Sequence, residues 1–69
     1  MNNIYKVKSE FPSDEFYFRA ESIEQAVEKF ARLKHYDMIT PRFTGAYILR
    51  NTVTDESLSI YVTRVVVLD

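Results

Sequence analysis

The chain has 69 residues, of which 46% are hydrophobic and 28% are charged, with one Gly, two Pro and no Cys. This composition predicts one folded domain over residues 1–69 and excludes disulfides, thiolate metal sites and an apolar run of the ~18 residues that a membrane span needs. The formal net charge of −1 lacks the excess of Lys and Arg that normally drives binding to a nucleic-acid backbone.

The first part of the chain predicts two strands that form a hairpin. Residues 4–9 alternate between apolar and basic side chains, with Tyr5 and Val7 on one side. Pro12 has no N–H to donate to a ladder and is followed by turn formers, so we expect the first strand to end before it. Residues 15–20 alternate again. One face of this second strand carries Phe16, Phe18 and Ala20, and the other carries Tyr17 and Arg19.

The segment from Ser22 to Lys34 gives the strongest helix prediction in the chain. Its apolar residues recur at the spacing of one helical face: Ile23, Ala26, Val27, Phe30 and Leu33. Ser22 is a suitable N-cap, and Gln25 three residues later completes a capping box. Lys34 points close to the apolar side, so we expect either its stem to cover the core edge or the helix to end before it.

Acidic side chains lie on the far side of this helix: Glu21, Glu24 and Glu28. They would lie near Glu10, Asp14 and Glu15 if the first hairpin turned back toward them. Such an acidic row can meet a basic partner. The commoner interpretation is a solvated helix face that improves solubility.

The second half of the chain predicts two further strands. Residues 36–44 have no clear period, and Pro41 disfavours helix before it, so we expect an extended or turn segment there. Gly45 is interpreted as a turn or bulge at the head of a strand over residues 46–51. The facing of that strand is ambiguous because three consecutive residues are apolar: Tyr47, Ile48 and Leu49.

Residues 51–57 predict a turn with its tip at residues 55–57, followed by the longest strand candidate, residues 58–68. Its alternation breaks at Arg64. A β-bulge near Thr63 or Arg64 would return Val65 and Val67 to the core face. The alternative is that residues 65–68 are covered on both sides by a second layer or a partner chain.

The order strand, strand, helix, strand, strand predicts an α+β fold of the ββαββ type. We expect a four-stranded, mostly antiparallel sheet with the helix packed across one face. Six apolar residues are predicted to form the centre of the core: Phe16, Phe18, Val27, Phe30, Ile60 and Val62.

No motif for catalysis, cofactor binding or metal binding is found in the sequence. The single histidine, His35, has only Asp37 nearby as a partner ligand, and we interpret it as a cation at the helix C-terminus. No Ser lies in a Gly-x-Ser-x-Gly context, and one Gly cannot form a Gly-rich phosphate loop. We therefore expect a protein without enzymatic activity, cofactor or metal.

The outer face of the predicted sheet is the first candidate site, because Tyr17, Arg19 and Tyr61 fall on it with Thr63. Lys6 and Lys8 extend this face if the first strand has the same facing. Three interpretations remain open: a solvated sheet face, a protein-binding surface rich in Tyr and Arg, and a sheet that stacks on nucleic-acid bases.

The architecture is similar to that of small phage-encoded inhibitors of host defence, such as anti-CRISPR proteins. The resemblance lies in a strand ending in Phe18-Arg-Ala20, a helix beginning Ser22-Ile-Glu-Gln-Ala-Val27, a final hairpin and the lack of catalytic residues. It implies a stand-alone protein that occupies a partner protein's surface, and it transfers no functional residue. A cytoplasmic location is expected on other grounds, because the sequence has no apolar run long enough for a membrane span and its N-terminus has no apolar signal region.

The leading hypothesis is therefore a protein-interaction module that binds through Tyr17, Arg19 and Tyr61 or through the three glutamates. A nucleic-acid-binding sheet is the alternative, disfavoured by net charge. A structural homodimer is the third, suggested by the apolar residues 65–68.

Overall fold

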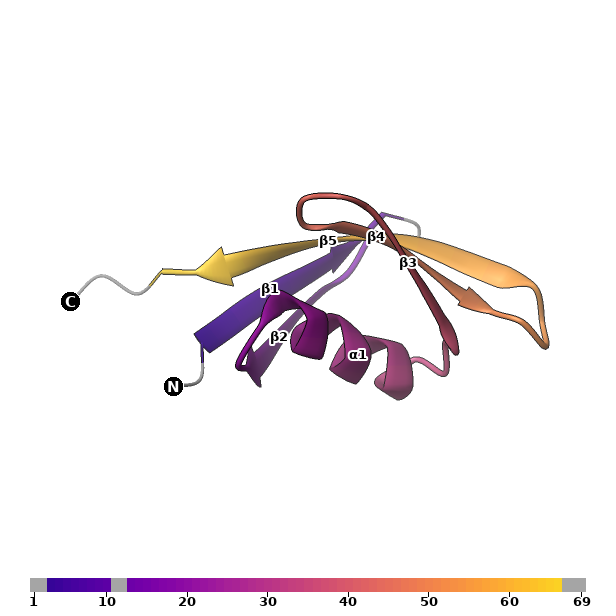
Figure 1. Ribbon diagram of the computed structural model, residues 1–69, viewed down its shortest axis with the longest axis horizontal. Coiled ribbons are helices and arrows are strands. Elements are labelled where there is room, and N and C mark those ends of the chain that lie inside the picture. Colours follow the sequence, from indigo (N-terminus) through magenta and orange to yellow (C-terminus); the bar gives the residue numbers. More distant parts are fainter. Residues whose placement is uncertain (1–2, 11–12, 67–69) are drawn as a thin grey trace.

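The computed structural model describes residues 3–10 and 13–66, which form two layers, a sheet and one helix (Figure 1). The strands and the helix follow in the order β1 (Asn3–Ser9), β2 (Glu15–Ala20), α1 (Ile23–Leu33), β3 (Met38–Phe43), β4 (Ala46–Asn51) and β5 (Glu56–Val65). The sheet order is β2-β1-β5-β4-β3, and every neighbouring pair is antiparallel. The α+β class and the antiparallel sheet are confirmed.

The sheet has five strands, so the predicted four-stranded ββαββ arrangement is wrong. The additional strand is β3, which lies at the edge of the sheet and, among the described strands, pairs with β4 alone. All six of its residues are exposed, so its sequence has no alternation of buried and exposed positions. Pro41 falls inside it, at a position that an edge strand tolerates because one side of the strand has no partner.

The first hairpin forms as predicted, and β1 then connects it to the rest of the sheet. Val7 is paired with Phe16 on β2 and with Val62 on β5. Partners that face each other across antiparallel strands share a face, so all three side chains point to the same layer. The register between β1 and β5 is continuous from Ile4 to Ser9.

The predicted bulge in β5 is absent. Arg64 instead stays in register opposite Tyr5 on the core face, near the end of the strand, where it is exposed. Val65 lies on the other face, half-buried. Val67 and residue 68 lie outside the described residues. The predicted turn tip also shifts, because Glu56 already belongs to β5.

The N-terminal cap of α1 confirms the role of Ser22. The Gln25 N–H donates to Ser22 Oγ at 3.1 Å, and Gln25 Oε1 accepts from the Glu21 N–H at 2.8 Å. The second bond of the capping box thus goes to the residue before the cap. The bond to Ser22 satisfies one of the backbone donors that the first helical turn leaves unpaired, and the bond from Glu21 holds the chain that enters the helix.

The helix ends at Leu33 in a Schellman motif. The Tyr36 N–H donates to Ala31 O at 2.8 Å, and the His35 N–H donates to Arg32 O at 3.3 Å. His35 occupies the left-handed position of this motif, with φ 65°. His35 therefore lies one residue beyond the C-cap Lys34, at the helix C-terminus where the sequence analysis placed it.

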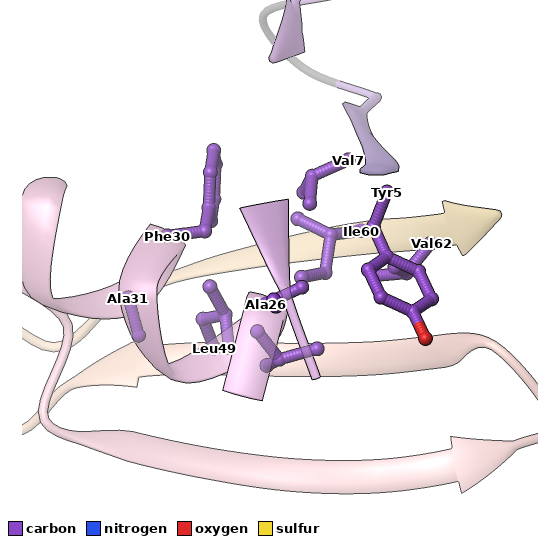
Figure 2. Close-up of a cluster of buried hydrophobic side chains, with 10 residues drawn as sticks. Tyr5, Val7, Ala26, Phe30, Ala31, Leu49, Ile60 and Val62 are labelled. Carbon is purple, nitrogen blue, oxygen red and sulfur yellow. The ribbon is translucent and has the colours of Figure 1, made fainter. Parts of the chain in front are cut away.

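The core lies between α1 and the inner face of the sheet (Figure 2). Phe30 is 1% exposed, and its ring centroid lies 5.4 Å from Phe16 and 6.1 Å from Phe18. The helix ends before Lys34, as one of the two alternatives predicted, and the Lys34 Nζ lies 4.4 Å from the Phe16 ring centroid, in a cation–π contact with this core residue. The predicted core residues are all buried or packed against the core; the buried residues that the prediction omitted include Tyr5, Val7, Ala20 and Leu49.

Candidate functional site

The outer face of the sheet is the face opposite α1, and no helix of the described residues covers it (Figure 1). We call it the open face. The register places six predicted residues on it: Lys6, Lys8, Tyr17, Arg19, Tyr61 and Thr63. The Tyr17 side chain is 60% exposed and that of Tyr61 is 42% exposed. The structure therefore brings together the residues of the first candidate site.

Strand pairing intersperses aromatic and basic groups across the open face. Lys6 lies between Tyr17 on β2 and Thr63 on β5. Lys8 lies one step further along, beside Tyr61. Each tyrosine thus lies directly across from a lysine on the neighbouring strand. Such cross-strand neighbours are close enough to contact the same partner molecule.

The open face continues across β4 and β3, which sequence reasoning missed. Ala46 is paired with Tyr61 on one side and with Phe43 on the other, and it is only 3% exposed although it faces outward. We attribute this burial to the two flanking rings. Phe43 is 64% exposed and Met38 is 46% exposed. Neither could be assigned to this face while β3 was not recognised as a strand.

Glu10 lies on the open face rather than beside the helix glutamates. Glu10, as a hydrogen-bond acceptor and then as a negative charge, raises the pKa of the Tyr61 hydroxyl, while Arg42 acts in the opposite direction. The predicted continuation of the acidic helix row through Glu10 is therefore wrong. With Glu10 and Glu15 near the lysines, the open face is mixed in charge and not strongly basic.

The three predicted helix glutamates do not form one row. Glu21 precedes the helix, and its N–H is bound to Gln25. Glu24 and Glu28 lie one turn apart and line a groove between α1 and β3. Burial, and after it the charge of Glu24, raises the pKa of Tyr47, which lines the same groove.

His35 and Asp37 form a tether between the end of α1 and the β4–β5 turn. Asn51 Nδ2 donates to His35 O at 2.8 Å. The Asp37 carboxylate accepts from the Thr52 N–H at 2.8 Å and from the Thr52 hydroxyl. Within residues 3–10 and 13–66, no group of three His, Cys, Asp or Glu side chains is placed to hold a metal ion.

The Asp37 tether predicts a loss of stability in acid. Its hydrogen bonds with Thr52 hold the pKa of Asp37 below the ordinary value of 3.8. A carboxyl whose pKa is lower in the folded state stabilises the fold fully above the unfolded pKa, and this contribution disappears as the pH falls through the folded pKa. We expect Asp37→Asn to lower the melting temperature at pH 7 and the difference from wild type to shrink below about pH 4.

Melting curves of both proteins between pH 2 and pH 7 measure this difference, and a 13C NMR titration of the carboxyl group measures the pKa directly. Asp14→Asn is the control, because it changes the same group in the β1–β2 turn. A constant difference in melting temperature between wild type and Asp37→Asn across this pH range would show that the stabilisation by the tether does not depend on the charge of the Asp37 carboxylate.

Among the described residues, no helix is long and apolar enough to cross a membrane. What the fold positions is a surface: aromatic, basic and apolar side chains on the open face, and a groove with two glutamates on the opposite layer. The likeness to phage inhibitors stays a prediction, since no protein-family model, curated protein or solved structure matches this chain.

Proposed function

We propose that this protein is a non-enzymatic interaction module that binds a partner protein through the open face of its sheet. The observation that carries the proposal is the exposure of Tyr17 and Tyr61 on a face that α1, the helix of the described residues, leaves uncovered. Tyrosine supplies a large rigid contact area with a polar end, and it is enriched where proteins bind each other tightly.

The charges of the open face favour a partner with acidic groups around an apolar centre. Lys6, Lys8 and Arg19 surround the tyrosines, and none of them forms an ion pair among the described residues, where the one ion pair joins Arg50 and Asp55. Carboxylates of a partner would therefore meet unpaired cations at the rim of the contact.

A protein partner is favoured over nucleic acid. Glu10 and Glu15 offset two of the cations on this face, and the net charge of the chain is −1. A backbone of phosphates requires a clear local excess of positive charge. An inhibitor of the kind that phages encode can act by covering a surface of its target, without any catalytic residue. We therefore propose inhibition of a host protein as the specific role of this module.

Site-directed photocrosslinking tests the proposal. A benzophenone amino acid is placed at Tyr17 or at Tyr61, and the matched control position is Val53, which is 91% exposed in the β4–β5 turn. In cells of the source organism, we expect one protein to be crosslinked from both tyrosine positions and not from Val53. Lys6→Glu should abolish this adduct.

Equal crosslinking from Val53, or no adduct from either tyrosine, would overturn the proposal. Titration with single-stranded oligonucleotides at low and high salt is the second arm. Salt-sensitive binding that is lost in Tyr17→Ala would replace the protein partner with nucleic acid.

A further inference from the structure

The groove between α1 and β3 lies on the inner layer, away from the open face. It has a volume of about 230 Å³. Its floor is largely apolar, and its helix side carries two carboxylates one turn apart; the lining residues are Glu24, Val27, Glu28, Ile39, Pro41 and Tyr47. Ile39 is 36% exposed there, so α1 leaves part of the inner face of the sheet uncovered.

The strand beside this groove has an open edge. β3 pairs with β4 on one side and with no described strand on the other. The opposite edge of the sheet differs, because Lys29 Nζ lies 2.5 Å from the Arg19 carbonyl oxygen of β2 and occupies a backbone acceptor there. A lysine at a sheet edge disfavours pairing with a further strand. β3 is therefore the edge that remains available to a partner strand.

Charged side chains are segregated across α1. Lys29 and Arg32 line the β2 side, with Phe18 and Leu33, whereas Glu24 and Glu28 lie on the β3 side. Neither glutamate forms an ion pair within residues 3–10 and 13–66. A strand that adds to β3 would thus lie beside two unpaired carboxylates.

From these observations we infer that β3 and the groove bind an extended, basic peptide segment of a partner by strand addition. Strand addition takes its affinity from main-chain hydrogen bonds and its specificity from pockets for alternate side chains. Alternate residues of the bound segment would face the α1 layer. One apolar side chain would fill the groove over Ile39 and Tyr47, and a Lys or Arg two residues away would reach Glu24 and Glu28.

A second copy of this chain fits the groove less well than a basic peptide. Two-fold pairing of β3 with β3 would place both helices on one face of a joined sheet, with the glutamate pairs of the two copies facing each other. Like charges at such a junction oppose association. Pro41 also removes one N–H from the strand, which suits a short segment better than a long continuous ladder.

The test is a selection of random short peptides displayed on phage against the wild-type protein. The enriched peptides are then measured against Glu28→Lys and against Glu21→Lys, the matched control with the same charge change outside the groove. We expect an enriched pattern of an apolar residue and a Lys or Arg two positions apart. Glu28→Lys should weaken binding on the order of tenfold or more, and Glu21→Lys should leave it nearly unchanged.

Hydrogen exchange of the bound protein gives an independent readout, because strand addition protects amides of β3 and not those of β2. Enriched peptides without basic residues, equal binding to both variants, or protection at β2 would overturn the inference. So would a concentration-dependent dimer that Glu28→Lys stabilises. The inference is independent of the proposed function, since Glu28→Lys leaves the Tyr17 crosslinking site unchanged, and either can fail alone.

Discussion

Phe30→Ala should lower the free energy of unfolding by about 3–5 kcal/mol, the cost of removing a fully buried Phe from a packed core. Phe30 is 1% exposed and contacts Phe16 and Phe18 on β2. A core in a domain of this size rarely supplies more than about 3–5 kcal/mol in total. The variant is therefore expected to be largely unfolded in water, as measured by urea denaturation followed by circular dichroism.

Phe43→Ala is the matched control, because it makes the same chemical change at a side chain that is 64% exposed on the open face. Its effect should be within about 0.5 kcal/mol. A Phe30→Ala protein that unfolds cooperatively near the wild-type midpoint would contradict the position of Phe30 between α1 and β2.

Gly45→Ala should destabilise the protein by at least about 2 kcal/mol, for two additive reasons. Gly45 has φ 79°, a left-handed conformation that residues with a Cβ disfavour. In addition, a Cβ at this position would lie 2.9 Å from the Val62 carbonyl oxygen, which is backbone of β5 and cannot rotate away. The Val62 N–H also donates to Gly45 O at 2.7 Å, so the shift needed to relieve the clash would disturb this bond.

Thermal unfolding of Gly45→Ala and of Thr44→Ala, at the exposed neighbouring residue, provides the measurement and its control. Amide NMR spectra should show the changes of Gly45→Ala concentrated where β4 meets β5. If the two variants melt together, the β3–β4 connection does not adopt the left-handed turn described above.

The elements with a buried face were predictable from the sequence, because burial imposes a period on the chain. β2 and α1 alternate or repeat as their geometry requires, and Ser22 is the N-cap that the pattern indicates. β4 was assigned to the right residues, but its facing needed the structure: Tyr47 and Leu49 pair with core residues of β5, and Ile48 pairs with Ser59.

The remaining features depend on contacts that no local pattern records. β3 is held by pairing with β4 and buries none of its residues, so hydrophobic periodicity could not reveal it. Because β3 was not predicted, Phe43 was not assigned to the open face and Ile39 was not assigned to the groove. Arg64 interrupts the alternation in β5 without a bulge. It lies on the core side of the sheet but near the end of the strand, where a charged side chain can reach solvent.

The position of β5 in the sheet has a consequence for the order of folding during synthesis. β5 is the last strand along the described chain, yet it lies at the centre of the sheet, between β1 and β4. Pairings between distant parts of a chain form slowly, because a long loop must close first. Until residues 56–65 leave the ribosome, the first hairpin and α1 have no central strand to close their shared core, so these elements should remain open to chaperones until β5 has been synthesised.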